Sequence, residues 1–139
     1  MFVMRKLIFL LSALLLCAGC EPLDMAEQTR INNQFLGLWQ EVDHPSSRCD
    51  YIGFRSDFKF VNYRLFLGSG DKLMYDYDGK PYHFEKGPEC SKGTVYTLVL
   101  DNRLKEFICK YNGLLYMWWQ ENSDPDKYVG NPDYAYERN

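Results

Sequence analysis

The sequence predicts an all-β protein, an antiparallel meander of about eight short strands that closes into a small barrel. Runs of aromatic and β-branched residues alternate with turn-forming pairs along most of the chain. No sequence pattern of a long helix interrupts them, and roughly 86 residues from Phe35 to Gln120 contain all of the expected strands. Barrel closure removes the exposed edges that an open sheet would have to protect, and a two-sheet β-sandwich is the alternative.

Residues 1–19 have the pattern of a secretory signal peptide. Arg5 and Lys6 precede an apolar run from Leu7 to Leu16 that contains one polar residue, Ser12, and small residues stand directly before Cys20. A membrane-spanning helix needs roughly 20 apolar residues, so this run is too short to be one. We therefore expect the segment to be removed on export, either as a lipoprotein signal or as a plain cleaved secretory signal.

The end of this segment, Leu16-Cys17-Ala18-Gly19-Cys20, resembles the bacterial lipoprotein signal, although Cys17 stands where such signals usually carry an aliphatic residue. The resemblance implies that Cys20 becomes the first residue of the mature chain and carries a diacylglycerol, with acyl chains such as palmitate. Two or more buried chains anchor a protein stably to a membrane. In enteric bacteria a residue other than Asp after the cysteine, here Glu21, directs such proteins to the outer membrane, so the resemblance implies a lipid-anchored envelope protein located there.

A chain that starts at Cys20 has 120 of the 139 residues, which suits one domain. Removing Arg5 and Lys6 from the 16 basic residues leaves 14 against 19 acidic ones, a formal net charge of −5. No basic patch is present to match a phosphate backbone, so we expect no binding to nucleic acid.

Within this chain, residues 20–34 are polar and read as a tether between anchor and barrel, although Asp24 could cap a short helix to Ile31. Residues 35–120 form the predicted barrel, and residues 121–139 form a polar, loosely packed tail. Asp78-Gly79 and Asn112-Gly113 are hairpin turn signals. The expected strands are Phe35 to Asp43, Asp50 to Arg55, Phe58 to Leu67, Lys72 to Tyr77, Pro81 to Lys86, Thr94 to Leu100, Lys105 to Tyr111 and Leu114 to Gln120.

Three cysteines, Cys49, Cys90 and Cys109, remain after Cys17 is removed and Cys20 is acylated. An exported protein meets an oxidising compartment, so we expect one disulfide and one free thiol. Successive connections of a meander alternate between its ends, which places the loops near Cys49 and Cys90 at the same end. The sequence therefore favours a disulfide between Cys49 and Cys90, with Cys109 as a competing partner for either thiol.

The first expected strand contains the motif Gly37-x-Trp39. It is similar to the first-strand signature of lipocalin-type barrels, and small bacterial lipoproteins of lipocalin-like shape are a familiar class. The resemblance implies that Trp39 plugs the closed end of the barrel and that Gly37 lets the chain pass close beside it.

The last expected strand, Leu114 to Gln120, is apolar at both parities, so each of its faces must be covered. One explanation is that the tail or the segment from Glu21 to Asn33 folds over it. The other is a surface for a partner protein, because Trp, Tyr and Met dominate interface hot spots. The residues of that candidate surface are Tyr116, Met117, Trp118 and Trp119.

The sequence contains no recognisable catalytic or metal-binding motif. His44 and His83 lie far apart, and the carboxylates Glu85, Glu89 and Glu106 are dispersed, so we expect no enzyme, no metal and no cofactor. We therefore expect a tethered binding or accessory protein that contacts another envelope or extracellular protein, for example as an inhibitor of a cell-wall enzyme. A carrier of a small apolar ligand in the barrel is the first alternative, and a cell-envelope hydrolase is the second.

Overall fold

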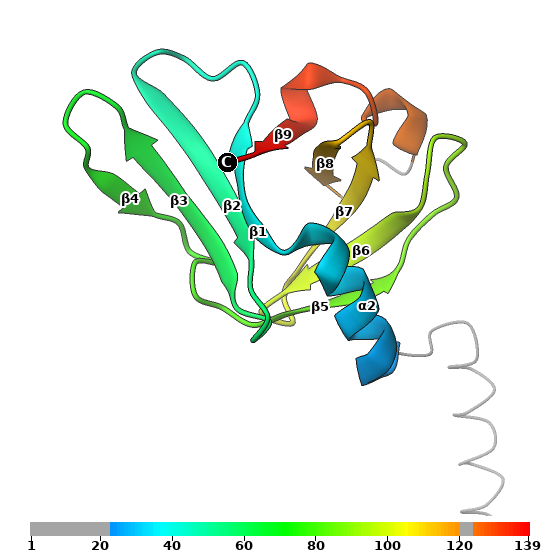
Figure 1. Cartoon of the computed structure of the whole chain (residues 1–139). Coiled ribbons are helices and arrows are strands. Elements are labelled where there is room, and N and C mark those ends of the chain that lie inside the picture. Colours follow the sequence, from blue (N-terminus) through cyan, green and yellow to red (C-terminus); the bar gives the residue numbers. More distant parts are fainter. Residues whose placement is uncertain (1–22, 120–123) are drawn as a thin grey trace, which may run out of the picture.

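The computed structural model describes residues 23–119 and 124–139, which form one antiparallel sheet of nine strands, curled into a half-barrel, and one short α-helix (Figure 1). The all-β prediction of a small lipocalin-like barrel is confirmed, and the strands belong to one sheet rather than to a sandwich of two. Their order in the sheet is β4-β3-β2-β1-β9-β8-β7-β6-β5. The strands are β1 (Gly37–Glu41), β2 (Arg48–Phe54), β3 (Phe60–Phe66), β4 (Lys72–Met74), β5 (Tyr82–Lys86), β6 (Val95–Leu100), β7 (Leu104–Tyr111), β8 (Leu114–Trp119) and β9 (Ala135–Arg138).

Tight turns join the consecutive strands from β6 to β8, as the sequence predicts. Asn112 and Gly113 both have positive φ, which is the backbone of the two-residue turn that Asn-Gly favours, and β7 pairs with β8 from Tyr111 to Leu114 onward. Asp101 and Asn102 take the same conformation between β6 and β7. Local turn chemistry therefore sets the register of this half of the sheet.

The turn at Asp78-Gly79 does not form the expected hairpin. The short strand β4 pairs with β3, whereas β5 pairs with β6, and neither pairs with the other. The Gly79 N–H donates to the carbonyl of Phe60 at 2.7 Å, and Asp78 accepts a hydrogen bond from the Asn62 N–H at 2.8 Å. The turn is thus held against β3, and a bridge between Lys59 and Pro81 brings the start of β3 beside β5.

The helix α2 (Met25–Phe35) occupies a segment that the sequence analysis assigned to a tether, and that assignment is wrong for these residues. Asp24 caps it as expected, since its carboxylate accepts from the Glu27 N–H at 2.8 Å. Ile31 and Phe35 are completely buried in the barrel core, where the Phe35 ring contacts those of Phe54 and Phe84. The helix therefore packs into the curled sheet as part of its core.

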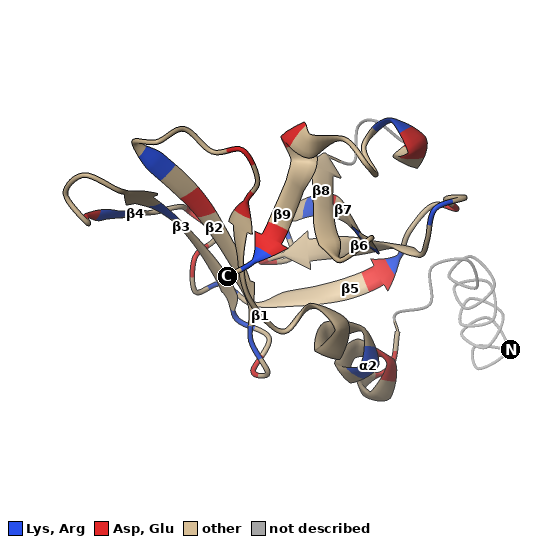
Figure 2. Ribbon diagram, turned by 45° about the horizontal axis from the view of Figure 1, so that its top comes forward, with Lys and Arg blue, Asp and Glu red and all other residues tan. Residues whose placement is uncertain are grey.

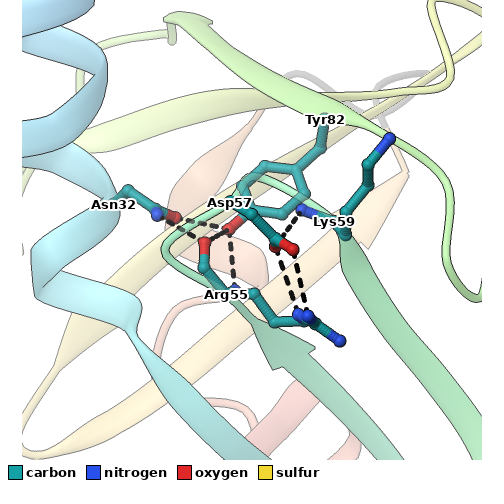
Figure 3. A network of polar contacts seen from close by, with 5 residues as sticks. All are labelled: Asn32, Arg55, Asp57, Lys59 and Tyr82. Carbon is teal, nitrogen blue, oxygen red and sulfur yellow. Dashed lines mark hydrogen bonds and ion pairs between the residues drawn. The ribbon is translucent and has the colours of Figure 1, made fainter.

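Two side-chain amides of α2 also bond to the sheet itself. Gln28 donates to the carbonyl of Phe84 at 2.7 Å and accepts from its N–H at 2.8 Å, so it takes the place of a neighbouring strand along the edge of β5. Asn32 donates to the Arg55 carbonyl at 2.8 Å and accepts from the hydroxyl of Tyr82 at 2.6 Å, in the network of Figure 3. The helix thereby joins the edge of β5 to the end of β2.

The chain from Asp124 onward is packed against the sheet, so the prediction of a loosely packed tail is wrong for the part that the structure describes. Two short 3-10 helices, η1 (Pro125–Lys127) and η2 (Pro132–Tyr134), lead into β9, which inserts between β1 and β8. Tyr128 stacks on Trp118 with ring centroids 5.2 Å apart. Val129 is buried in the same hydrophobic cluster as Trp118. The expectation that the tail covers the apolar strand is therefore confirmed.

Because the tail covers β8, most of the candidate partner surface is not exposed. Tyr116 and Trp118 are buried beneath the tail, so their assignment to an exposed surface is wrong. Met117 packs against the inner core of the barrel, and only Trp119, which is 58% exposed, is freely accessible among these four residues.

The predicted disulfide between Cys49 and Cys90 is absent, and all three described cysteines are free. Cys49 lies inside β2, paired with Leu65 of β3, and not in the loop before it. Cys90 lies in the loop after β5, where its thiol approaches Asp126, and it packs near the buried Cys109. The predicted lipidation site, Cys20, and the predicted signal motif before it lie outside the described residues.

Candidate functional site

One end of the barrel is closed around Trp39. Its indole is completely buried and donates to the Phe35 carbonyl at 2.8 Å, which ties β1 to the end of α2. The guanidinium of Arg138 lies 4.3 Å from the centre of the indole ring and also donates to the carbonyls of Gln34 and Leu36. The indole of the motif is therefore buried in the core, and Arg138, a cation from the last strand that the sequence patterns did not reveal, lies over it.

The backbone conformation at Gly37 also favours glycine. Gly37 has a φ of +114°, and a Cβ atom there would stand 3.4 Å from an Arg138 nitrogen. A side chain at this position would thus be strained by its own backbone conformation, while its Cβ atom would make an ordinary contact with Arg138.

A cavity lies toward the other ends of the same strands. In β2, Phe54 contacts Phe35 of α2, and Asp50 and Ile52, nearer the start of the strand, line the cavity. In β6, Tyr96 contacts Phe35, and Leu100 at the end of the strand lines the cavity. We call this region the barrel mouth. Its volume is about 460 Å³, and its lining consists of Asp50, Ile52, Phe60, Asn62, Tyr75, Asp76, Tyr77, Leu100, Leu104, Glu106, Met117, Trp119 and Tyr136.

On one wall of the barrel mouth, Asp50 is held by an ion pair. Arg64 of β3 binds it in a bidentate manner, with nitrogen–oxygen distances of 2.7 and 3.2 Å, and the hydroxyl of Tyr75 donates to it at 2.9 Å. The backbone N–H of Asp50 is satisfied by Glu41 of β1. This wall is therefore a rigid, hydrogen-bonded arrangement whose carboxylate is already compensated.

Elsewhere in the mouth, the side chains of Glu106 of β7 and Tyr136 of β9 take part in no ion pair or side-chain hydrogen bond among the described residues. Burial raises the pKa of Glu106 to about 7. The pKa of Tyr136 is also raised, first by burial and then by the nearby charges of Glu106 and Asp50. The mouth therefore contains a carboxyl group that changes charge near neutral pH beside an unpaired phenol.

A second cavity, of about 510 Å³, lies outside the barrel between α2 and the loop that follows β5. Glu27, Arg30 and Pro88 are among its lining residues, and so is Leu23, with which the described chain begins. We place the candidate site in the barrel mouth because its walls are strands of one sheet.

The sequence patterns indicated few of the residues that line this site. Met117 and Trp119 of the candidate partner surface line the mouth, and Glu106 was noted only as a dispersed carboxylate. Its position two residues from Ile108, on the inward face of β7, was the available signal. No position in the sequence pattern indicated Tyr136, because β9 was not predicted.

Neither His44 nor His83 approaches the mouth: His44 bonds to the carbonyl of Pro45 in a loop, and His83 lies 3.8 Å from Glu85 on the outer surface. Within residues 23–119 and 124–139, no group of three potential metal ligands is close enough to hold an ion. In the same part of the chain no helix has the length and apolar character to cross a membrane.

Comparison with known proteins gives no match: no family model, curated protein or solved structure shows significant similarity to this chain. The lipocalin-like description therefore rests on the curled antiparallel sheet and on the arrangement of Gly37, Trp39 and Arg138.

Proposed function

We propose that this protein is a lipid-anchored binding module of the bacterial outer membrane whose barrel mouth takes up a small, largely apolar ligand. The cavity beside Glu106 and Tyr136 carries the proposal. Ligand sites are typically clefts of about 300 to 1,000 Å³ with apolar walls and a few polar groups, and this cavity fits that description. The anchor is supported by the sequence pattern at Cys20.

The proposal is tested with phenylbutanol, a neutral molecule with one aromatic ring and one hydroxyl group. Titration into the purified protein, followed by amide NMR spectra, should shift the signals of Leu104, Met117 and Tyr136, which line the mouth. Amide signals of the second cavity, such as those of Glu27 and Glu89, should stay in place. Shifts confined to the second cavity would place the site there and contradict the proposal.

Two variants form a matched pair, one that fills the mouth and one that makes a similar change elsewhere. Met117→Trp adds a large ring to the cavity wall and should abolish the shifts. Leu67→Trp makes a similar change at an exposed position of the β3–β4 connection and should leave binding as in the wild type. Unfolding curves of both variants separate loss of binding from loss of fold.

A contact with another envelope protein is the second candidate function, and one surface favours it. The hairpin of β3 and β4 exposes Phe66, Leu67, Leu73 and Met74, although large apolar side chains are normally buried. The strand β4 also forms one end of the sheet, so its outer backbone groups are free to pair with a strand of a partner.

The test of this second function is a pulldown from solubilised envelope with the wild type and with Leu73→Lys/Met74→Lys. A stoichiometric partner that the wild type retains and the variant loses supports docking at β4. Retention of the same partner by both proteins would exclude this surface as the contact.

A further inference from the structure

The charged side chains that line the barrel mouth are acidic, namely Asp50, Asp76 and Glu106. Arg64 binds Asp50 and compensates its charge. Within the described part of the chain, Asp76 and Glu106 belong to no ion pair. The mouth therefore carries uncompensated negative charge, which favours a positively charged ligand group.

Glu106 is an acidic lining residue of the mouth that has apolar side chains beside it in the lining. Leu104, Met117 and Trp119 line the mouth with it, and its partial burial among them disfavours the ionised form. A ligand cation would supply the missing partner. The titratable and charged groups on the elements that face it are Glu41 of β1, Asp50 of β2, Arg64 of β3, Tyr75 and Asp76 after β4, and Tyr136 of β9.

The aromatic lining suits an organic cation. Trp119, Tyr77 and Tyr136 line the mouth beside Glu106, and the electron-rich faces of such rings attract ammonium groups. Trp119 is largely exposed at the end of β8, where it can receive the apolar body of a ligand. A bare metal ion fits less well, because no three potential ligands converge within the described residues.

Building on the proposed function, we propose that the barrel mouth selects small organic cations, amines whose ammonium group lies against Glu106 and whose apolar body lies against Trp119 and Tyr136. The ammonium group donates hydrogen bonds to the carboxylate, and the rings cover the rest of the molecule. A neutral ligand of the same shape gains the apolar contacts but leaves the carboxylate unpaired.

Three molecules with one body and different head groups test the proposal: phenylbutylamine, phenylbutanol and phenylbutyrate. At about pH 8 the amine should bind to the purified protein roughly tenfold more tightly than the alcohol, because a charge-assisted hydrogen bond replaces a neutral one. The anionic phenylbutyrate should bind most weakly. Affinities come from titration calorimetry, and the NMR shifts of Met117 and Tyr136 locate each ligand.

Matched variants assign the preference to one carboxylate. Glu106→Gln should reduce the affinity for the amine to that for the alcohol and leave the affinity for the alcohol unchanged. Glu85→Gln is the control: Glu85 pairs with Lys105, the neighbour of Glu106 that points to the other face of β7. This variant should bind the amine like the wild type.

A proton count gives a further readout. Near pH 7 part of Glu106 is protonated, so binding of the amine should release a fraction of a proton, which calorimetry detects by comparing buffers of different ionisation enthalpy. The affinity for the amine should also fall as the pH decreases from about 8 to about 5.5, as Glu106 loses its charge. Neither effect should occur in Glu106→Gln.

The outcomes separate this inference from the function on which it rests. If the alcohol shifts the mouth signals and the amine binds no more tightly, or if Glu106→Gln keeps the preference, selection of cations is wrong and a neutral-ligand site remains. If none of the three molecules shifts those signals, both proposals fail. The comparison of the three ligands on the wild type decides the matter even if Glu106→Gln does not fold.

Discussion

At the scale of single residues, the closed end of the barrel depends on the contact between Trp39 and Arg138. The sequence motif Gly37-x-Trp39 indicated the position and role of the indole, because a tryptophan in a first strand beside a glycine is a local pattern. Arg138 could not be paired with it from sequence, since 99 positions separate them and the strand that carries Arg138 has only four residues. Long-range partners of this kind depend on the sheet order.

Replacement of this indole tests the plug directly. Trp39→Ala should lower the free energy of unfolding by about 3 to 5 kcal/mol, because a fully buried ring is removed from the core. Trp119→Ala, which removes a largely exposed ring, should cost less than about 1 kcal/mol. Urea unfolding measures both, and a loss below about 1 kcal/mol for Trp39→Ala would show that the indole does not support the fold.

Glu106 makes stability depend on pH. Burial raises the pKa of Glu106 to about 7, whereas an unfolded Glu titrates near about 4.3. Between these values the folded state binds more protons than the unfolded state, so the free energy of unfolding decreases as the pH rises through this window. Above about pH 7 the whole cost of the buried charge is present.

Glu106→Gln removes that charge and should be more stable than the wild type at about pH 8, by on the order of 2 kcal/mol. The difference should vanish near about pH 4, where both side chains are neutral. Glu85→Gln, at a half-exposed position on the outer surface, serves as control and should show no such trend. A stability gain that is independent of pH would point to packing rather than charge.

At the scale of elements, α2 shows why its segment was read as a tether. Its buried positions, Gln28, Ile31, Asn32 and Phe35, have the spacing of a helix face, but two of the four are amides. Those amides form hydrogen bonds to backbone groups of the sheet, so two polar residues hold the helix against the sheet where apolar residues would be expected. The helix cap at Asp24 was the local signal, and it was correct.

The amide of Gln28 should matter more than any exposed contact of the helix. Gln28→Ala leaves the N–H and carbonyl of Phe84 without partners and should cost about 2 to 3 kcal/mol. Arg30→Ala, which removes an exposed ion pair with Glu27 on the same helix, should cost less than about 1 kcal/mol. Amide exchange at Phe84 should accelerate in the first variant only, and equal losses in both would refute this role.

The turn signals in the sequence predicted the positions of turns correctly, but they did not always predict which strands pair. Asn112-Gly113 and Asp78-Gly79 both form turns, yet only the first joins two paired strands. The difference arises because Asp78 and Gly79 bond to the backbone of β3, which no local pattern reveals. The missed strand β9 follows two short 3-10 helices that begin at Pro125 and Pro132, and such a proline-containing segment indicates turns rather than a strand.

At the scale of the whole molecule, the sheet order explains the failed disulfide prediction. Counting hairpins assumed eight strands joined in sequence, but β9 separates β1 from β8 and β4 does not pair with β5. Cys49 is also a strand residue, held in register against Leu65. The fold class follows from local patterns, whereas the distance between two loops requires the complete topology.

The membrane anchor remains a prediction of the sequence. Cys20→Ser should move the protein from the membrane fraction to the soluble fraction, because the acyl chains are attached to that thiol. Cys17→Ser is the matched control and should remain in the membrane fraction. Intact-mass analysis of the wild type should find a chain that begins at Cys20 with added acyl mass, and an unmodified chain would contradict the prediction.

The two edges of the sheet are not equivalent, and this limits how copies of the molecule can assemble. On the edge at β5, Gln28 binds the backbone of Phe84, whereas no strand of the described part of the chain lies beyond β4. Residues of both charge signs are interspersed along the strands (Figure 2). Two copies that join through β4 use up the free edge of each, so strand pairing ends at a dimer and cannot extend into a fibre.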